Sequence, residues 1–171
     1  MKTLLSLLAL LASITLSHAQ SYIALMDGAQ DGGGLRQGSG TVDLTLTGNS
    51  LSLSGSFSGI TTPVTVAHIH GPAGPLPGAA GVLYNLHGTV IPTGVTSGSI
   101  NGLVTLVENP IPNYSLAQQL SDLNAGLWYI NIHNSTFPGG EIRGQILVPE
   151  PSILTLIGLG TVGMLCWRRR S

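Results

Sequence analysis

The sequence predicts an all-β domain, either a β-sandwich or a Greek-key barrel, with one short helix. Three observations support this prediction. Apolar and polar residues alternate through several short segments, glycine-rich turns separate these segments, and one stretch alone has the period of an amphipathic helix. A chain of 171 residues with 24 glycines and 10 prolines suits a single domain of this kind.

The clearest pair of strands is residues 41–47 and 51–57, which alternate strictly on either side of the turn Gly48-Asn49. Serine and threonine fill their polar side, as expected for an antiparallel sheet with one solvated face. Four further strands are expected at residues 22–26, 63–70, 82–86 and 99–107. The total is seven to nine short strands.

A helix is expected over residues 116–123. Ser115 and Gln118 match a capping box, and leucines recur every three to four residues along one face. The helix leads into residues 127–148, an aromatic and β-branched hairpin that turns through Pro138-Gly139-Gly140. This hairpin is the most strand-like stretch of the chain.

Residues 1–19 have the three parts of a secretory signal peptide: Lys2, an apolar run, and the small-residue cleavage site Ser17-His18-Ala19. We therefore expect signal peptidase to remove them and the protein to be exported. The apolar run is too short for a spanning helix.

The other end combines Pro149-Glu150-Pro151, an apolar stretch at residues 153–167, and Arg168-Arg169-Arg170. As a helix the stretch is about 22 Å long, short of a ~30 Å hydrocarbon core, but flanking arginines and local thinning of the bilayer can cover the difference. The arginines place this end in the cytoplasm. We expect a C-terminal transmembrane helix, and three regions in all: residues 1–19, 20–148 and 149–171.

This ordered combination resembles the PEP-CTERM sorting tail of Gram-negative bacteria. The resemblance implies recognition by an exosortase, a membrane protease-transpeptidase that cleaves near the motif. It also implies export to the cell envelope, the surface or the extracellular matrix, and an association with exopolysaccharide or biofilm.

Few charges remain between the two ends. Residues 20–149 contain six acidic residues and two arginines, and no lysine follows Lys2. Nucleic acid is excluded as a partner, because its binding depends on neutralised phosphates. The single cysteine, Cys166, lies in the tail, so the domain must fold without a disulfide.

Histidines are the sharpest chemical signal. His68 and His70 lie two residues apart on one expected strand, so their side chains share a face at a spacing of roughly 7 Å. Two such imidazoles hold copper or zinc when a third donor arrives, and His133 and His87 are the candidates. The alternative is that these histidines are partly buried and hydrogen-bond to loop carbonyls.

Three segments then resemble a known family: residues 68–73 (HIHGPA), 126–133 (GLWYINIH) and 137–145 (FPGGEIRGQ) are similar to the CHRD (chordin-type) domain. The resemblance covers residues 22–147 and implies an immunoglobulin-like β-barrel distantly similar to Cu,Zn superoxide dismutase. His68, His70, His87 and His133 are similar in order to the copper ligands of that enzyme.

The zinc subsite of the dismutase has no counterpart, because residues 71–86 contain no His, Asp or Glu. The cysteine pair of that enzyme is also missing. This departure argues against an efficient dismutase and leaves a mononuclear copper or zinc site open.

Glu141 and Arg143 share a strand face in the hairpin. One interpretation makes Glu141 an acceptor for a ligand histidine and Arg143 a contact for an anion. The other makes them an ion pair, or bonds to a preceding loop, that closes the end of the barrel. We favour the second.

The sequence therefore favours a non-enzymatic, exported module that binds or builds material at the cell surface or in an exopolysaccharide matrix. The alternative is a metal-binding extracytoplasmic protein with copper or zinc on the His-x-His strand and the late histidine.

Overall fold

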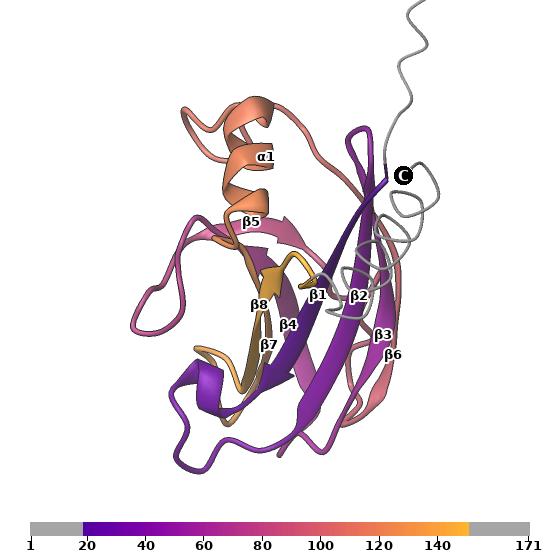
Figure 1. Ribbon diagram of the computed structural model, residues 1–171. Helices are drawn as coiled ribbons and strands as arrows, with labels where there is room; N and C mark the ends of the chain where they lie inside the picture. The colour runs from indigo at the N-terminus through magenta and orange to yellow at the C-terminus, as the bar shows by residue number, and fades with distance from the viewer. Residues whose placement is uncertain (1–18, 151–171) are drawn as a thin grey trace, which may run out of the picture.

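The computed structural model describes residues 19–150, which form one eight-stranded antiparallel sheet and one α-helix (Figure 1). The elements, in chain order, are β1 (Gln20–Asp27), the 3-10 helix η1 (Ala29–Asp31), β2 (Ser39–Thr47), β3 (Ser50–Ser58), β4 (Val64–His70), β5 (Val82–Asn85), β6 (Gly98–Thr105), α1 (Leu116–Asn124), β7 (Tyr129–Asn134) and β8 (Ile142–Leu147). The predicted all-β class with one helix is confirmed.

The sheet has the order β5-β4-β7-β8-β1-β2-β3-β6 and curves until its two ends approach each other. The connection from β5 to β6 bridges the remaining gap. The amide of Leu86 donates to the carbonyl of Ala67 in β4 at 2.8 Å, and the carbonyl of Val90 accepts from the amide of Asn101 in β6 at 3.0 Å. The result is a nearly closed barrel.

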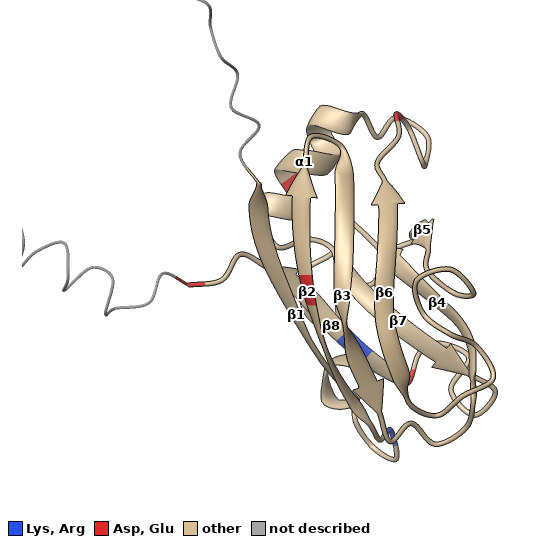
Figure 2. Ribbon diagram, turned by 90° about the vertical axis from the view of Figure 1, so that its right-hand side faces the viewer, with Lys and Arg blue, Asp and Glu red and all other residues tan. Residues whose placement is uncertain are grey.

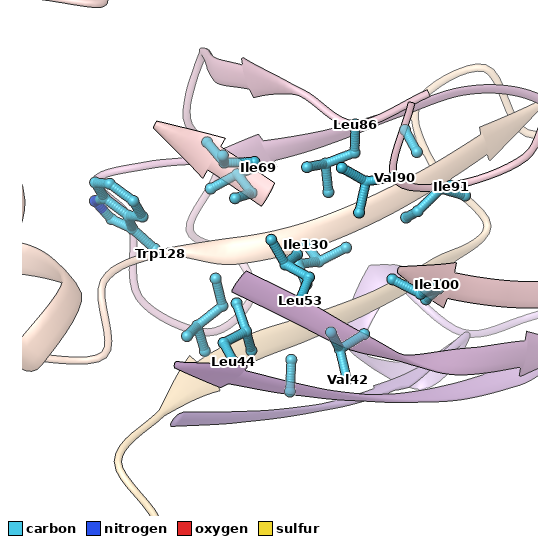
Figure 3. Close-up of a cluster of buried hydrophobic side chains, with 14 of the residues drawn as sticks. Val42, Leu44, Leu53, Ile69, Leu86, Val90, Ile91, Ile100, Trp128 and Ile130 are labelled. Carbon is cyan, nitrogen blue, oxygen red and sulfur yellow. The ribbon is translucent and has the colours of Figure 1, made fainter. Parts of the chain in front are cut away.

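The barrel interior is apolar, as the alternation of the strands requires. Leu44 and Leu53 face each other across β2 and β3, and Ile69 and Ile130 face each other across β4 and β7. Figure 3 shows these side chains meeting between the two halves of the sheet. All four are almost completely buried, and each contributes about 1.5–3 kcal/mol of hydrophobic free energy.

Trp128 closes the end of the core nearest α1. It is fully buried, and its indole N–H donates to the hydroxyl of Tyr114 at 2.8 Å. At the start of the helix, the hydroxyl of Ser115 accepts from the amide of Gln118 at 3.2 Å, as the capping pattern predicted. The Gln118 side chain, by contrast, donates to Asp122 at 2.9 Å.

The two halves of the barrel differ on their outer faces. On β2, β3 and β6 the outward side chains are mostly exposed Ser, Thr and Asn, and Figure 2 shows how few charges this side carries. On β7 and β8, both faces are buried, because the loops after β1 and β4 cover the outer side. A layer of buried polar side chains, called the polar layer below, lies between these loops and the sheet and includes His70, His133, Glu141, Arg143 and Gln145.

The signal peptide and the C-terminal transmembrane helix predicted from the sequence fall mainly or wholly outside the described residues. Between residues 19 and 150, no helix is long and apolar enough to cross a membrane.

Candidate functional site

Three of the four candidate histidines meet in the polar layer. His68 and His70 point outward from β4, because Ala67 and Ile69 between and beside them face the core. His133 comes from the neighbouring strand β7. One nitrogen from each of the three rings lies within 4.8 Å of the other two.

The hydrogen bonds of two of these rings set their protonation. Nδ1 of His70 lies 3.0 Å from the carbonyl oxygen of Ala80, and Nδ1 of His133 lies 2.9 Å from that of Pro138. Since a carbonyl can only accept, Nδ1 is the donor in both rings, and Nε2 carries the lone pair. Backbone carbonyls orient metal-binding histidines in this way.

The lone pairs point into the cluster. Nε2 of His133 is 3.4 Å from Nδ1 of His68, so in the metal-free protein His68 donates this hydrogen bond. Nε2 of His70 is buried and has no partner within the described part of the chain. A buried acceptor without a partner costs about 1–3 kcal/mol, and a metal ion would satisfy it.

The cluster is electrically neutral at neutral pH. Burial, together with repulsion from His133, His70 and His87, lowers the pKa of His68 to about 4. Burial also lowers the pKa of His70 and of His133. Neutral imidazole is the form that ligates metals.

The spacing fits a single ion after a small adjustment. Three atoms within 4.8 Å of one another have a common point no more than about 2.8 Å from each, whereas zinc–imidazole bonds measure about 2.0–2.1 Å. Each ring would move by less than about 1 Å. Imidazole nitrogens without carboxylate or thiolate suit copper and zinc rather than magnesium or calcium.

His87 is not part of this group. Its ring is about as near to His68 as the other rings are, at 5.5 Å between centroids, but the nitrogens that lie within 4.8 Å of one another belong to His68, His70 and His133. Nδ1 of His87 lies 3.4 Å from the carbonyl oxygen of Ala67. The structure therefore brings together His68, His70 and His133 and leaves His87 beside them.

Arg143 supports the cluster indirectly. Its guanidinium lies 3.4 Å above the ring of Tyr129, which stacks on His70 with 5.0 Å between ring centroids. The same guanidinium donates to the carbonyls of Gly74 and Gly78, at 2.8 and 2.7 Å. Arg143 thus fixes both the loop after β4 and the ring that packs against His70. Nothing in the sequence indicated that Tyr129 packs against His70; it shows only that Tyr129 lies on the strand that bears His133.

Glu141 is fully buried at the opposite end of the polar layer. It accepts hydrogen bonds from the amide of Gln37 at 3.2 Å, from the amide and hydroxyl of Thr61, and from the side chain of Asn134. All of these donors belong to loops or to the end of β7, and none is a histidine. Within residues 19–150, Glu141 and Arg143 form no ion pair with each other; the pair present there joins Arg36 to Asp31 at 3.6 Å.

The proposed sorting motif begins where the domain ends. Strand β8 stops at Leu147, and Val148, Pro149 and Glu150 are exposed. Pro151 and the cluster Arg168-Arg169-Arg170 lie outside the described residues.

Comparison with protein families decides the identity of the domain. The CHRD domain model matches residues 14–146. The chain belongs to the CHRD domain family. The model of the PEP-CTERM protein-sorting motif matches residues 147–170, immediately after the CHRD domain. Both resemblances seen in the sequence are confirmed.

The sorting motif implies an exported, envelope-associated protein of a Gram-negative bacterium that is processed by an exosortase-type system. Searches of curated proteins and of solved structures returned no match to this chain.

Proposed function

We propose that this CHRD domain is a non-enzymatic module that binds or builds material at the cell surface or in an exopolysaccharide matrix. Export and exosortase-type processing deliver it there, and the folded β-barrel is the part that stays outside the cell.

The position of the sorting motif carries this proposal. The motif starts at residue 147, the last residue of β8, so the whole barrel lies on one side of it. Cleavage near the motif would release or transfer the barrel without removing a strand. The exposed hydroxyl side chains of β2 and β3 suit a hydrated, uncharged polymer. They accept and donate hydrogen bonds, and they carry no positive charge that would favour phosphate-bearing ligands instead.

The test is to follow the protein in cells that produce it, with and without an active exosortase. We expect a shortened protein in the surface or matrix fraction of the first strain, and the unprocessed chain in the membranes of the second. An identical distribution in both strains would contradict the proposal.

A second candidate function is favoured by one observation, the buried and unpartnered Nε2 of His70, whose ring clusters with those of His68 and His133. We propose that this cluster binds one copper or zinc ion. No carboxylate belongs to the cluster, so the site is a simple three-imidazole centre rather than a two-metal centre.

Elemental analysis of the purified protein after incubation with each metal tests this second candidate. We expect about one ion per chain, lost when His68 and His70 are both replaced by alanine. The matched control is Asn85→Ala, an exposed position that pairs with His68 in the β4–β5 register. Equal metal content in the double variant, the control and the unchanged protein would exclude this site.

A further inference from the structure

A pocket lies in the same polar layer, between the loop after β4 and the segment that follows β1. Its volume is about 290 Å³, and Arg143 and Gln145 of β8 line it together with Asp27, Gln30, Pro75 and Leu76. Figure 1 shows the loop after β4 standing out from the barrel on the side where it covers β7 and β8. Among the described residues, no histidine lines this pocket, and Arg143 connects it to the histidine cluster through the ring of Tyr129.

The charge of Arg143 has no carboxylate partner among the described residues, although the side chain is only 2 % exposed. Asp27 and Arg143 are register partners in the β1–β8 ladder, yet they do not come within ion-pair distance. A buried charge is ordinarily paired. Both residues line the pocket.

Both groups keep unused hydrogen-bonding capacity. Arg143 uses three of its five N–H groups, on Gly74, Gly78 and Gln145. The Asp27 carboxylate accepts from the amide and the side chain of Gln30, at 2.9 and 3.1 Å, which leaves about two of its four acceptor sites. Arg143 therefore keeps about two free donors and Asp27 about two free acceptor sites, and both residues line the same small pocket.

We infer that this pocket binds a single sugar unit of a neutral polysaccharide. Adjacent sugar hydroxyls each donate and accept, so a pair of them can bridge Asp27 and Arg143 and complete both. Pro75 and Leu76 supply an apolar wall for the C–H face of the ring. This inference rests on the proposed function as a matrix module and names the ligand class of that module.

The balance of charge excludes the simplest alternatives. The Asp27 carboxylate would repel an anionic ligand that Arg143 attracts, and the Arg143 guanidinium would repel a cationic ligand that Asp27 attracts. For either ligand, the repulsion offsets the attraction. At about 290 Å³ the pocket is at the low end for small-molecule sites, which span roughly 300–1,000 Å³. One ring fits, and the rest of a chain would extend into solvent.

Binding is measured by saturation-transfer NMR and calorimetry on the full chain in a phosphocholine detergent, which has no sugar headgroup. The probes are methyl β-glucoside, cellotetraose, chitotetraose and sodium glucuronate. We expect saturable binding of at least one neutral probe. Asp27→Asn should weaken that binding about ten-fold, because one charge-assisted hydrogen bond is lost, and should strengthen glucuronate binding, because the repulsive charge is gone.

Leu76→Ala is a second variant that tests the apolar wall without touching a buried group, since Leu76 is partly exposed. Asp43→Asn, at an exposed position of β2, is the matched control and should bind as the unchanged protein does. Thermal melts establish that each variant is folded.

Absence of binding to every neutral probe would overturn the inference, and so would binding that is equal in Asp27→Asn, Leu76→Ala and Asp43→Asn. Both outcomes leave the proposed function intact if the exosortase-dependent fractionation succeeds. Failure of that fractionation would overturn the matrix function itself, whatever the sugars do.

Discussion

Replacing Glu141 with glutamine removes the charge from the fully buried carboxylate that joins three parts of the domain. Glu141 receives hydrogen bonds from Gln37 in the loop after β1, from Thr61 in the loop after β3, and from Asn134 at the end of β7. Glutamine has the same shape but one acceptor oxygen instead of two. The NH₂ group of glutamine would replace one of the accepting oxygens, so one N–H donor of the site would face another donor and lose its partner.

The expected loss of stability follows from these contacts. Hydrogen bonds to a charged acceptor contribute about 1.5–3 kcal/mol, neutral ones about 0.5–1.5, and a buried donor left unpaired costs about 1–3. Glu141 accepts from four donors in all, since both the amide and the hydroxyl of Thr61 contribute. With three of these bonds weakened and one donor unpaired, we expect Glu141→Gln to lower the free energy of unfolding by about 4–7 kcal/mol. This is a large share of the 5–15 kcal/mol typical of a domain.

Urea unfolding monitored by tryptophan fluorescence, to which the buried Trp128 contributes, is the assay. The midpoint should fall by about 2–3.5 M for a slope of about 2 kcal/mol per M. Asp43→Asn is the control, because it makes the same kind of charge change at an exposed position. A loss below about 0.5 kcal/mol for Glu141→Gln would show that the loops do not depend on this carboxylate, and would refute the reasoning.

Three further predictions follow from the same layer. Burial and repulsion between the rings lower the pKa of His68 to about 4, and burial lowers the pKa values of His70 and His133, so the unfolded chain takes up protons first as the pH falls. Stability should therefore be full above about pH 7 and fall as the pH drops from about 6.5 towards 4. Urea midpoints that do not change with pH over this range would contradict this prediction. If the second candidate function holds, zinc at 100 times its Kd should stabilise the protein by about 2.7 kcal/mol in a thermal melt, and the stabilisation should vanish in His133→Ala. Gly140 has a φ of +126°, and a Cβ there would clash with the side chains of Asn131 and Asp31. Gly140→Ala should therefore destabilise the domain by well over the about 0.5 kcal/mol of an ordinary surface change, and a smaller loss in urea unfolding would contradict this.

Strands β2 and β3 were predictable because each has one buried face and a period of two. The hairpin at β2 and β3 is the clearest case, since its register pairs Leu44 with Leu53 as the alternation requires. Strand β7 gave no such alternation, because loops bury its outer face as well, and its aromatic and β-branched residues identified it instead. The wider similarity to immunoglobulin and dismutase barrels stays a prediction.

The candidate site was only partly predictable. Strand period alone placed His68 and His70 on one face, but it could not tell that β7 lies next to β4 and brings in His133, because that pairing joins residues 65 apart. Sequence order suggested His87 as readily as His133, and only the fold separates them. The role of Arg143 depends on a loop whose path over the sheet has no signal in the sequence.

Peptide mass spectrometry of the protein recovered from the cell envelope tests the central claim most directly. The account predicts a first peptide that begins at Gln20, peptides from the whole barrel, and a last one that ends near Glu150, with no peptide from residues 153–171. Recovery of the intact end with Arg168-Arg169-Arg170 would contradict processing at the sorting motif, and with it the delivery of this CHRD domain that we propose.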